Sequence, residues 1–559
     1  MNEQNNAAKA YEIYFSVTEQ KHTDVTTTQL NMLYNVMCRI KRDKSYATEI
    51  AAMQGKDEIS LLTRIEKYFE DYNNLYGLDI RETLTETLDS GLSDGAFFTL
   101  RSFKIDENGT PIPHSPVEFL TGDIAHVKAV LLSQNTKMPI IVSKMRVIWV
   151  AEYGKSGTEV AENVSEIEFD LSLSRPCEIK FKITVEDSDG KAASVVETAF
   201  GGLLFSKDEL LPTHIPPEDL VDFWTSEIAR LWSIDPRSEI PDGYDGNVKS
   251  LYDMPKKNFY KLTELNLDYL KTMRDNAQPT VAESVLEQFD IWDVMLKAPG
   301  PCPATAYVSV PKGAEKHSLP MKFVFDGYGV RCPAPITSDE NIVVHCSHHG
   351  YELGEHRDNY YVPFNQTVCH YYGRGINEVN AGYDDISDCY MTYLLIRDLQ
   401  MVHFATTPEL CKDVLGLADA FSGKVIISGG SMGGYQSICI GGLITLLNEK
   451  VNPIEIEKIL PNIPAFCNIA GHTEGRVKTY LTTYVDGVDY YDAAQFASLI
   501  TAPVEVNRIG LGDDTCPAGG IIAMLNNLGG RFEANILQNS SHGFIPDTRF
   551  QNWNKYSKS

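Results

Sequence analysis

The sequence predicts an α/β protein. Its largest part is a mostly parallel sheet flanked by helices, preceded by a β-sandwich and an N-terminal helical segment. Three observations predict this order. Residues 1–80 place apolar residues at helical spacing, residues 81–210 hold short β-rich runs between turn signals, and residues 211–559 alternate strand-like and helical patterns. We therefore expect domains over 1–80, 81–210 and 211–559.

The N-terminal segment 1–80 shows a helical repeat and no motif that carries chemistry. The repeat is clearest at Leu61, Leu62, Ile65, Tyr68 and Phe69. Basic residues occur in this segment, but acidic residues offset them. A solvated helix face is the favoured interpretation over a binding patch.

The sequence pattern of residues 81–210 predicts an immunoglobulin-like β-sandwich. Turn signals such as Glu107-Asn108-Gly109 separate the β-rich runs at nearly regular spacing, as in sandwich domains. A domain of this kind could bind a sugar chain or simply pack against the neighbouring domain. Packing against the neighbouring domain is the favoured interpretation. The runs are FFTLRSFKI, AHVKAVLLS, MPIIVSKMRVIWVAEY, SEIEFDL and EIKFKITVE.

The region 211–559 opens after Pro212, Pro216 and Pro217 with the amphipathic stretch EDLVDFWTSEIARLW. The runs FDIWDVMLK and ATAYVSVPK predict an antiparallel strand pair. Further predicted strands are MKFVFDGYG, NIVVHCS, TVCHYYG, KVIISGG, KILPNI, VEVNRIGLG and FEANILQ, and the clearest helices are SDCYMTYLLIRDLQMVHF and PAGGIIAMLNNL. This alternation is typical of a mostly parallel sheet covered by helices.

Composition excludes several classes of protein. The chain has 559 residues, 43% hydrophobic and 22% charged, as in ordinary globular proteins. Its net charge of −27 would repel a nucleic acid, so we expect no such partner. We also expect no membrane association and a cytoplasmic location, because no apolar run is long enough for a bilayer and no signal peptide is visible. The 11 cysteines lack zinc-like spacing, which indicates free thiols.

The clearest chemical motif is KVIISGGSMGGYQSICIGGL. An apolar strand leads into Gly429-Gly430-Ser431-Met432-Gly433, and a helix follows. This is the G-x-S-x-G pattern in the strand–turn–helix setting of a nucleophile elbow. A turn this sharp strains the serine, and side chains at the flanking glycines would collide with the strand and the helix. The pattern predicts Ser431 as a nucleophile.

A serine nucleophile needs a histidine base and an acid that orients it, in the order Ser, Asp or Glu, His. Two histidines follow Ser431, namely His472 and His542. For His472 the intervening acids are Glu449, Glu455 and Glu457, and none follows a strand end. His542 comes just after the predicted strand FEANILQ. The strand VEVNRIGLG ends at Asp513 and Asp514, of which Asp513 is favoured as the acid and Asp514 as a helix cap.

The stretch VVHCSHHGYELG suits a loop that donates one of the two oxyanion N–H groups. We expect Tyr351 to supply this group and Met432, the residue after the nucleophile, to supply the other. The histidines His345, His348, His349 and His356 also raise the question of a metal site. No carboxylate stands at a supporting spacing, and this hydrolysis needs no metal, so we expect neither a metal nor a cofactor.

The run from about residue 215 to 550 resembles the acetyl xylan esterase and cephalosporin-C deacetylase family of α/β-hydrolases. The matching pieces are EDLVDFW, HGYELG, RDLQMVHFATTPEL, GGSMGGYQ, GLGDDTCPAG and SHGF. The resemblance implies an α/β-hydrolase domain, with Ser431, Asp513 and His542 as triad and Tyr351 and Met432 at the oxyanion. It also implies deacetylation of small acetylated carbohydrates without a cofactor, by a homo-oligomer.

Three positions depart from the family pattern. Met432 stands where the family has Gln, Arg374-Gly375-Ile376 replaces Arg-Gly-Gln, and His542-Gly543 replaces His-Glu. No catalytic group is lost. The departures indicate a divergent branch of the family and leave the substrate preference open.

Two other functions fit parts of the sequence. A serine peptidase of the prolyl-oligopeptidase type uses the same Gly-Gly-Ser-x-Gly-Gly elbow, but its propeller would require repeats of about 20–50 residues that the sequence lacks. A non-catalytic carbohydrate-binding protein on a degenerate hydrolase is the third class. The intact serine, aspartate and histidine candidates argue against it. The expected function is therefore a serine esterase that deacetylates sugars or xylo-oligosaccharides.

Overall fold

Two compact units divide the chain. One contains residues 1–206 together with 538–552, and the other contains residues 207–537 together with 553–559. The computed structural model describes residues 11, 13–25, 27–42, 48, 58–76, 96–133, 139–186, 198–238, 259–261, 283–300, 302–329, 334–347, 349–350, 353, 382, 385–414, 416–448, 453–477, 479, 484–546 and 551–558.

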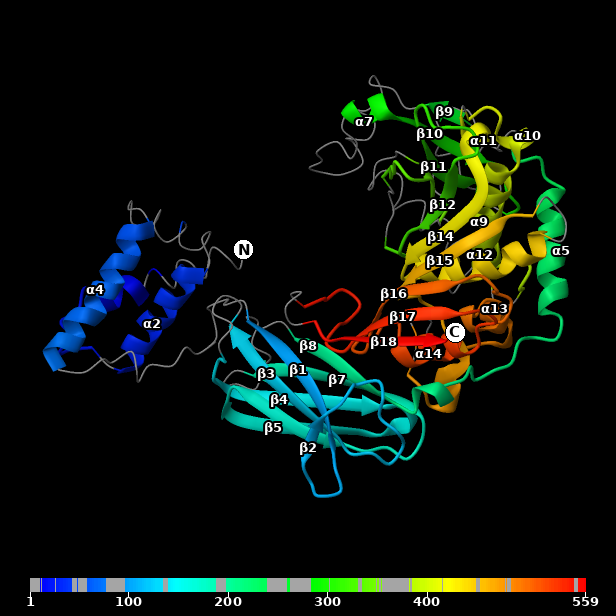
Figure 1. Cartoon of the computed structure of the whole chain (residues 1–559). Coiled ribbons are helices and arrows are strands. Elements are labelled where there is room, and N and C mark those ends of the chain that lie inside the picture. Colours follow the sequence, from blue (N-terminus) through cyan, green and yellow to red (C-terminus); the bar gives the residue numbers. More distant parts are fainter. Residues whose placement is uncertain are drawn as a thin grey trace. The chain divides into compact units, whose positions relative to one another are not determined.

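The described residues of the N-terminal part of the first unit include two long helices. Figure 1 shows helices α2 (Thr27–Arg42) and α4 (Glu58–Tyr76), and their buried residues belong to one hydrophobic cluster. Leu33 and Val36 of α2 and Ile65 and Phe69 of α4 are fully buried in it. The spacing of these residues by three or four positions puts them on one face of each helix.

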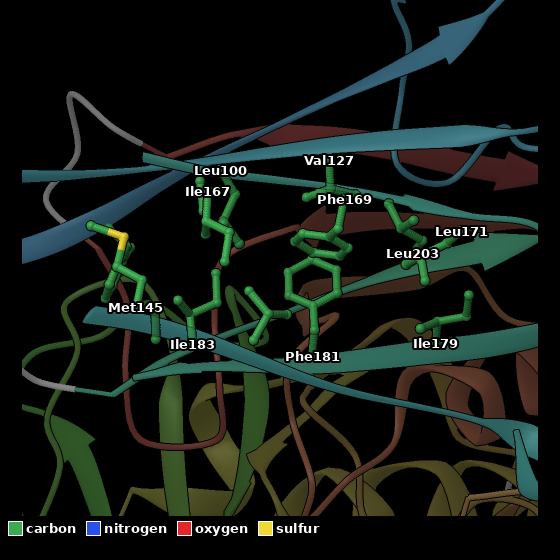
Figure 2. Packing of buried hydrophobic residues seen from close by; sticks show 14 of the residues in the cluster. Leu100, Val127, Met145, Ile167, Phe169, Leu171, Ile179, Phe181, Ile183 and Leu203 are labelled. Atoms are coloured by element: carbon green, nitrogen blue, oxygen red, sulfur yellow. The ribbon is translucent and has the colours of Figure 1, made fainter. Parts of the chain in front are cut away.

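Eight strands of the first unit form two antiparallel four-stranded sheets, ordered β2-β1-β3-β6 and β5-β4-β7-β8. Their inner residues share one hydrophobic core, in which the Phe169 and Phe181 rings meet edge to face at 5.5 Å (Figure 2). The strands are β1 (Ala96–Ile105), β2 (Pro111–Pro113), β3 (Ala125–Ser133), β4 (Val142–Ala151), β5 (Ser156–Val164), β6 (Glu166–Leu171), β7 (Cys177–Glu186) and β8 (Ala199–Phe205).

A ten-stranded mixed sheet organises the second unit, in the order β18-β17-β16-β15-β14-β12-β13-β11-β10-β9 (Figure 1). The strands are β9 (Phe259–Lys261), β10 (Phe289–Leu296), β11 (Ala304–Pro311), β12 (Leu319–Phe325), β13 (Ile342–Ser347), β14 (Phe421–Gly430), β15 (Glu455–Asn462), β16 (Val504–Gly510), β17 (Phe532–Leu537) and β18 (Trp553–Lys558). The pair β10–β11 is antiparallel, as the sequence predicts.

The centre of this sheet is parallel. Strands β13, β12, β14, β15, β16 and β17 pair in parallel, while antiparallel strands flank them on both sides. The loops that follow these parallel strands all leave from one edge of the sheet, which is where α/β proteins place their ligands. The predicted strand TVCHYYG lies outside the described residues.

Helices α9 (Tyr390–Thr406) and α12 (Met432–Asn448) are buried along almost their whole length. Helix α12 packs against β14 and β15 and against α9 and α13. The other helices of this unit are α5 (Leu220–Trp232), α7 (Glu283–Gln288), α10 (Pro408–Cys411), α11 (Leu417–Ala420), α13 (Ala493–Ala497) and α14 (Ala518–Asn526), with short 3-10 turns at Lys207–Glu209, Ile469–Glu474 and Asp486–Tyr490. Among the described helices, none has both the length and the apolar composition that crossing a bilayer requires.

Candidate functional site

Ser431 stands at the junction between β14 and α12, in a backbone conformation that serine rarely adopts. Its φ is +56°, in the left-handed region. The Ser431 N–H donates to the Asn462 carbonyl at 2.9 Å, and the Ser431 carbonyl accepts from the N–H groups of Tyr435 and Ala465, each at 3.0 Å. Strain at one residue persists only where its surroundings fix it, and such residues cluster at functional sites. The local geometry is that of the predicted elbow.

The glycines of the elbow are required by their neighbours. A Cβ at Gly433 would overlap the carbonyl of Phe325, the last residue of β12, and a Cβ at Gly429 would overlap the carbonyl of Gly433. Both clashes are with backbone of the central sheet or of α12, which cannot move aside. The first and last positions of G-x-S-x-G are therefore closed to any other residue, for the reason the sequence predicts.

Met432 is the first residue of α12 and is fully buried. The first intrahelical bond of α12 runs from the Tyr435 N–H to the Ser431 carbonyl. The N–H of Met432 therefore lies ahead of the helical hydrogen-bond ladder, at the positive end of the helix dipole. This position is suited to stabilising negative charge that develops near Ser431.

A second backbone turn lies against the elbow, and it comprises residues 326–329. It follows β12, whose Phe325 pairs with Gly429 of β14. A Cβ on Gly327 would lie 3.7 Å from the Ser431 Cβ and 3.5 Å from the Gly430 carbonyl oxygen. The turn Asp326-Gly327-Tyr328-Gly329 is thus the backbone next to Ser431 on this side. The predicted strand MKFVFDGYG extends through this turn, whereas β12 ends at Phe325, and the two glycines after it were the visible turn signal.

The predicted oxyanion loop after β13 differs from this arrangement. Strand β13 ends at Ser347, as the predicted strand NIVVHCS does, but β12 stands between β13 and β14 in the sheet. Tyr351 itself lies outside the described residues. Strand β12, not β13, directly neighbours β14, the strand that leads into Ser431, so the backbone after β12 borders Ser431.

Asp513 lies three residues beyond the end of β16 and is fully buried. Its Oδ1 accepts from the N–H groups of Thr515 at 2.9 Å and Cys516 at 2.8 Å. Asp514 is exposed. The prediction that Asp514 caps the next helix is wrong, because Pro517 is the N-cap of α14. A buried, oriented carboxylate suits the acid of a triad, and an exposed one does not.

His542 lies in the segment 538–552, at the tip of a compact turn. The Ser540 hydroxyl donates to the Phe544 carbonyl at 2.9 Å, and the Ser541 N–H donates to the same carbonyl at 3.1 Å. The segment begins where β17 ends, at Leu537, and Leu537 pairs with Gly510 of β16. Asp513 and His542 therefore follow neighbouring parallel strands within three and five residues of their ends.

The histidines that raised the question of a metal are engaged by protein atoms where the structure describes them. His345 Nδ1 lies 2.7 Å from the Ala334 carbonyl oxygen and Nε2 lies 2.8 Å from Asp326 Oδ2. His349 Nδ1 lies 2.6 Å from the Tyr390 hydroxyl and Nε2 lies 3.1 Å from the Tyr328 carbonyl oxygen. His348 and His356 lie outside the described residues. A histidine binds a metal through a ring nitrogen, and the two ring nitrogens of His345 and the two of His349 already contact protein atoms.

No protein-family model and no curated protein matches the chain. Among solved structures it is similar to an acetyl xylan esterase from Paenibacillus sp. R4, with 17% identity, 61% of this chain and 94% of that chain covered, and a TM-score of 0.41. It is similar in the same way to acetyl xylan esterase 1 from Thermoanaerobacterium sp. JW/SL YS485, with 16% identity, 61% and 93% coverage, and a TM-score of 0.41.

A third similar structure is an acylaminoacyl peptidase from Pyrococcus horikoshii, with 11% identity, 80% of this chain and 76% of that chain covered, and a TM-score of 0.30. Identities and TM-scores this low determine neither the fold nor the activity of the chain.

Proposed function

We propose that the chain is a serine esterase that removes acetyl groups from acetylated sugars or xylo-oligosaccharides through an acetyl-serine intermediate. The observation that carries this proposal is the backbone of Ser431, held at φ +56° between a central parallel strand and a buried helix. A serine is held in such a turn when its hydroxyl has to be presented above the sheet. The sugar specificity rests on the sequence motifs.

In the proposed reaction, the Ser431 oxygen attacks the acetyl carbonyl while His542 accepts the hydroxyl proton. The carbon–oxygen bond to the sugar then breaks, and His542 returns the proton to the leaving sugar alcohol. Water attacks the acetyl-serine by the same route, releasing acetate and restoring Ser431. Asp513 keeps the imidazole in the required tautomer and stabilises its cationic form. The parallel neighbours β16 and β17 support this pairing of Asp513 with His542.

Two backbone N–H groups stabilise the oxyanion in this proposal. One belongs to Met432, at the N-terminus of α12, and the other to Tyr328 in the turn beside the elbow. Tyr328 replaces the Tyr351 of the sequence prediction in this role. Each such donor contributes about 3 kcal/mol to transition-state stabilisation, judged from known oxyanion holes.

We propose that residues 1–80 form a helical domain, 81–210 an immunoglobulin-like sandwich and 211–559 the esterase domain. The two facing sheets with a shared core support the second of these. The partners we propose are a small acetylated carbohydrate and further copies of the chain. Size-exclusion chromatography with light scattering measures how many copies of the chain assemble.

The test compares acetate release by the wild type and Ser431→Ala on a chromogenic acetyl ester and on a panel of acetylated xylo-oligosaccharides and monosaccharides. The matched control is Ser498→Ala, which changes an exposed serine at the end of α13. We expect release by the wild type and the control, and a loss of about 10⁴-fold or more in kcat with Ser431→Ala. Release of amine from a prolyl anilide instead would assign the peptidase function. Unchanged acetate release by Ser431→Ala would exclude Ser431 as the nucleophile.

A further inference from the structure

The turn 326–329 is connected to a buried histidine from a different loop. His349 follows β13, and its Nε2 lies 3.1 Å from the carbonyl oxygen of Tyr328. The Tyr328 and His349 rings also meet nearly perpendicularly, with centroids 5.4 Å apart. A carbonyl oxygen only accepts hydrogen bonds, so Nε2 carries the proton at this contact.

The opposite nitrogen of the same ring contacts Tyr390, the first residue of α9. His349 Nδ1 lies 2.6 Å from the Tyr390 hydroxyl. With the proton on Nε2, the neutral imidazole accepts at Nδ1 from the Tyr390 O–H. The two residues are each 1% exposed, so water does not compete for these bonds. A buried chain of bonds therefore runs from Tyr390 through His349 to the Tyr328 carbonyl.

Close packing fixes the backbone next to His349 and the position of Tyr390. Gly350 has a φ of +69°, and a Cβ there would lie 2.6 Å from the Cys302 Cβ and 2.8 Å from the Pro303 carbonyl oxygen. The backbone after His349 is thus held tightly against the segment that leads into β11. Tyr390 is held within α9, which is buried along its length. His349 and Tyr390 are therefore both held in buried, closely packed surroundings.

We propose that His349 and Tyr390 are positioning residues that hold the turn 326–329 in place beside Ser431. The inference deepens the proposed esterase function and rests on it. The bond to the Tyr328 carbonyl restricts rotation about the Tyr328 backbone, and the Tyr390 hydroxyl fixes the imidazole that makes this bond. An oxyanion donor works best when it is already in place before the charge develops. Neither residue needs to touch the substrate.

The decisive variant is Tyr390→Phe, which removes one hydroxyl and keeps the ring. Its matched control is Tyr491→Phe, because Tyr491 is also a fully buried tyrosine whose hydroxyl bonds to Thr392 Oγ1 at 2.9 Å and to the Ile386 carbonyl. We expect Tyr390→Phe to lower kcat for acetate release by about ten- to a hundredfold with little change in KM, since small misplacements of a catalytic group have effects of this size. Tyr491→Phe should keep the wild-type kcat.

A second measurement separates positioning from general destabilisation. A trifluoromethyl ketone that forms a tetrahedral adduct on serine should bind Tyr390→Phe more weakly by the same factor as kcat falls, while a non-hydrolysable amide analogue should bind as before. His349→Gln, whose amide can still donate toward Tyr328, should recover part of the activity that His349→Ala loses.

Three outcomes would refute either the positioning role of His349 and Tyr390 or the proposed esterase function. Equal kcat for Tyr390→Phe and Tyr491→Phe, with an active wild type, would refute the positioning pair alone. Equal weakening of both inhibitors would also refute it, because ground-state binding would then be affected as well. A wild type that neither releases acetate nor forms the serine adduct would refute the proposed function itself. Should Tyr390→Phe fail to fold, the comparison of His349→Gln with His349→Ala decides the same question.

Discussion

The side-chain amide of Gln436 donates to the carboxyl group of Asp398 at 2.6 Å, and this bond joins α12 to α9 inside the second unit. Gln436 lies one helical turn beyond the elbow, and both residues are almost completely buried. Burial raises the pKa of Asp398 to about 8, although the Gln436 bond and the charge of Arg397 act in the opposite direction. The carboxyl group behind the nucleophile helix is therefore protonated at neutral pH.

This protonation predicts a specific pH dependence of stability. In the unfolded chain the Asp398 carboxyl loses its proton near the ordinary aspartate pKa of 3.8, whereas in the folded chain it does so near pH 8. Between these values the folded state binds the extra proton, so the free energy of unfolding falls as pH rises, by at most about 1.4 kcal/mol per pH unit. The contribution is complete below about pH 4 and is lost by about pH 8.

Asp398→Asn removes this dependence because an amide does not titrate in the window. Denaturant unfolding at several pH values should show the variant gaining stability relative to the wild type as pH rises from about 4 to about 8. Asp419→Asn is the control, since the Asp419 side chain is 74% exposed and should give a flat difference. A flat difference for Asp398→Asn as well would mean that the buried carboxyl is ionised in the folded protein.

The glycines of the elbow differ in the space around them, and this difference predicts unequal effects of alanine. Gly433→Ala would place a methyl group in overlap with the Phe325 carbonyl, whereas the nearest atoms to a Cβ on Gly430 lie 3.8 Å and 3.9 Å away, on Asn462. We expect Gly433→Ala to lower the free energy of unfolding by about 3 kcal/mol or more. Gly430→Ala should leave it unchanged or raise it by up to about 1 kcal/mol, because alanine restricts the unfolded chain.

Urea unfolding of the two variants beside the wild type measures this difference. A similar loss of unfolding free energy in Gly433→Ala and Gly430→Ala would mean that the Phe325 contact is not what excludes a side chain at Gly433.

The elbow could be predicted from the sequence because every part of it is local. The apolar strand, the glycines, Ser431 and the helix lie within one continuous stretch, although the carbonyl that excludes a side chain at Gly433 belongs to Phe325 of the neighbouring strand. Asp513 could be predicted for a similar reason. It directly follows a strand-like run, the sequence favoured it over Asp514, and the structure shows Asp513 buried and Asp514 exposed.

Contacts that depend on strand order could not be predicted in this way. The turn at Tyr328 borders Ser431 because β12 is inserted between β13 and β14, so residues about a hundred positions apart become neighbours. The hydrophobic pattern of a buried strand says that it joins the sheet but not beside which strand. The prediction placed the oxyanion loop after β13, whereas the function proposed above uses the turn after β12, which borders Ser431.

Edge strands were also missed. Strand β5, with the sequence SGTEVAENV, is largely exposed, and β18 forms one edge of the large sheet. Polar residues and charges on edge strands limit pairing with other molecules, and they also remove the apolar alternation by which strands are recognised.

The two neighbouring aspartates after β16 should respond differently to the same substitution. Asp513 Oδ1 accepts two backbone N–H groups, from Thr515 and Cys516, so we expect Oδ2 to be the oxygen that accepts from His542. In Asp513→Asn the amide oxygen can keep the backbone bonds, which turns the amide NH₂ toward the imidazole and favours the wrong tautomer. We expect kcat for acetate release to fall by about 10²–10⁴-fold with folding preserved.

Asp514→Asn supplies a control that is adjacent in sequence and has the same chemistry, because the Asp514 side chain is exposed. It should retain the wild-type kcat. Circular dichroism and unfolding curves should be alike for the two variants, so that a difference in kcat reports the orientation of the base. If the two variants lost activity equally, or if Asp514→Asn lost more, Asp513 would not be the acid, and the pairing of β16 with β17 would no longer support a triad with His542.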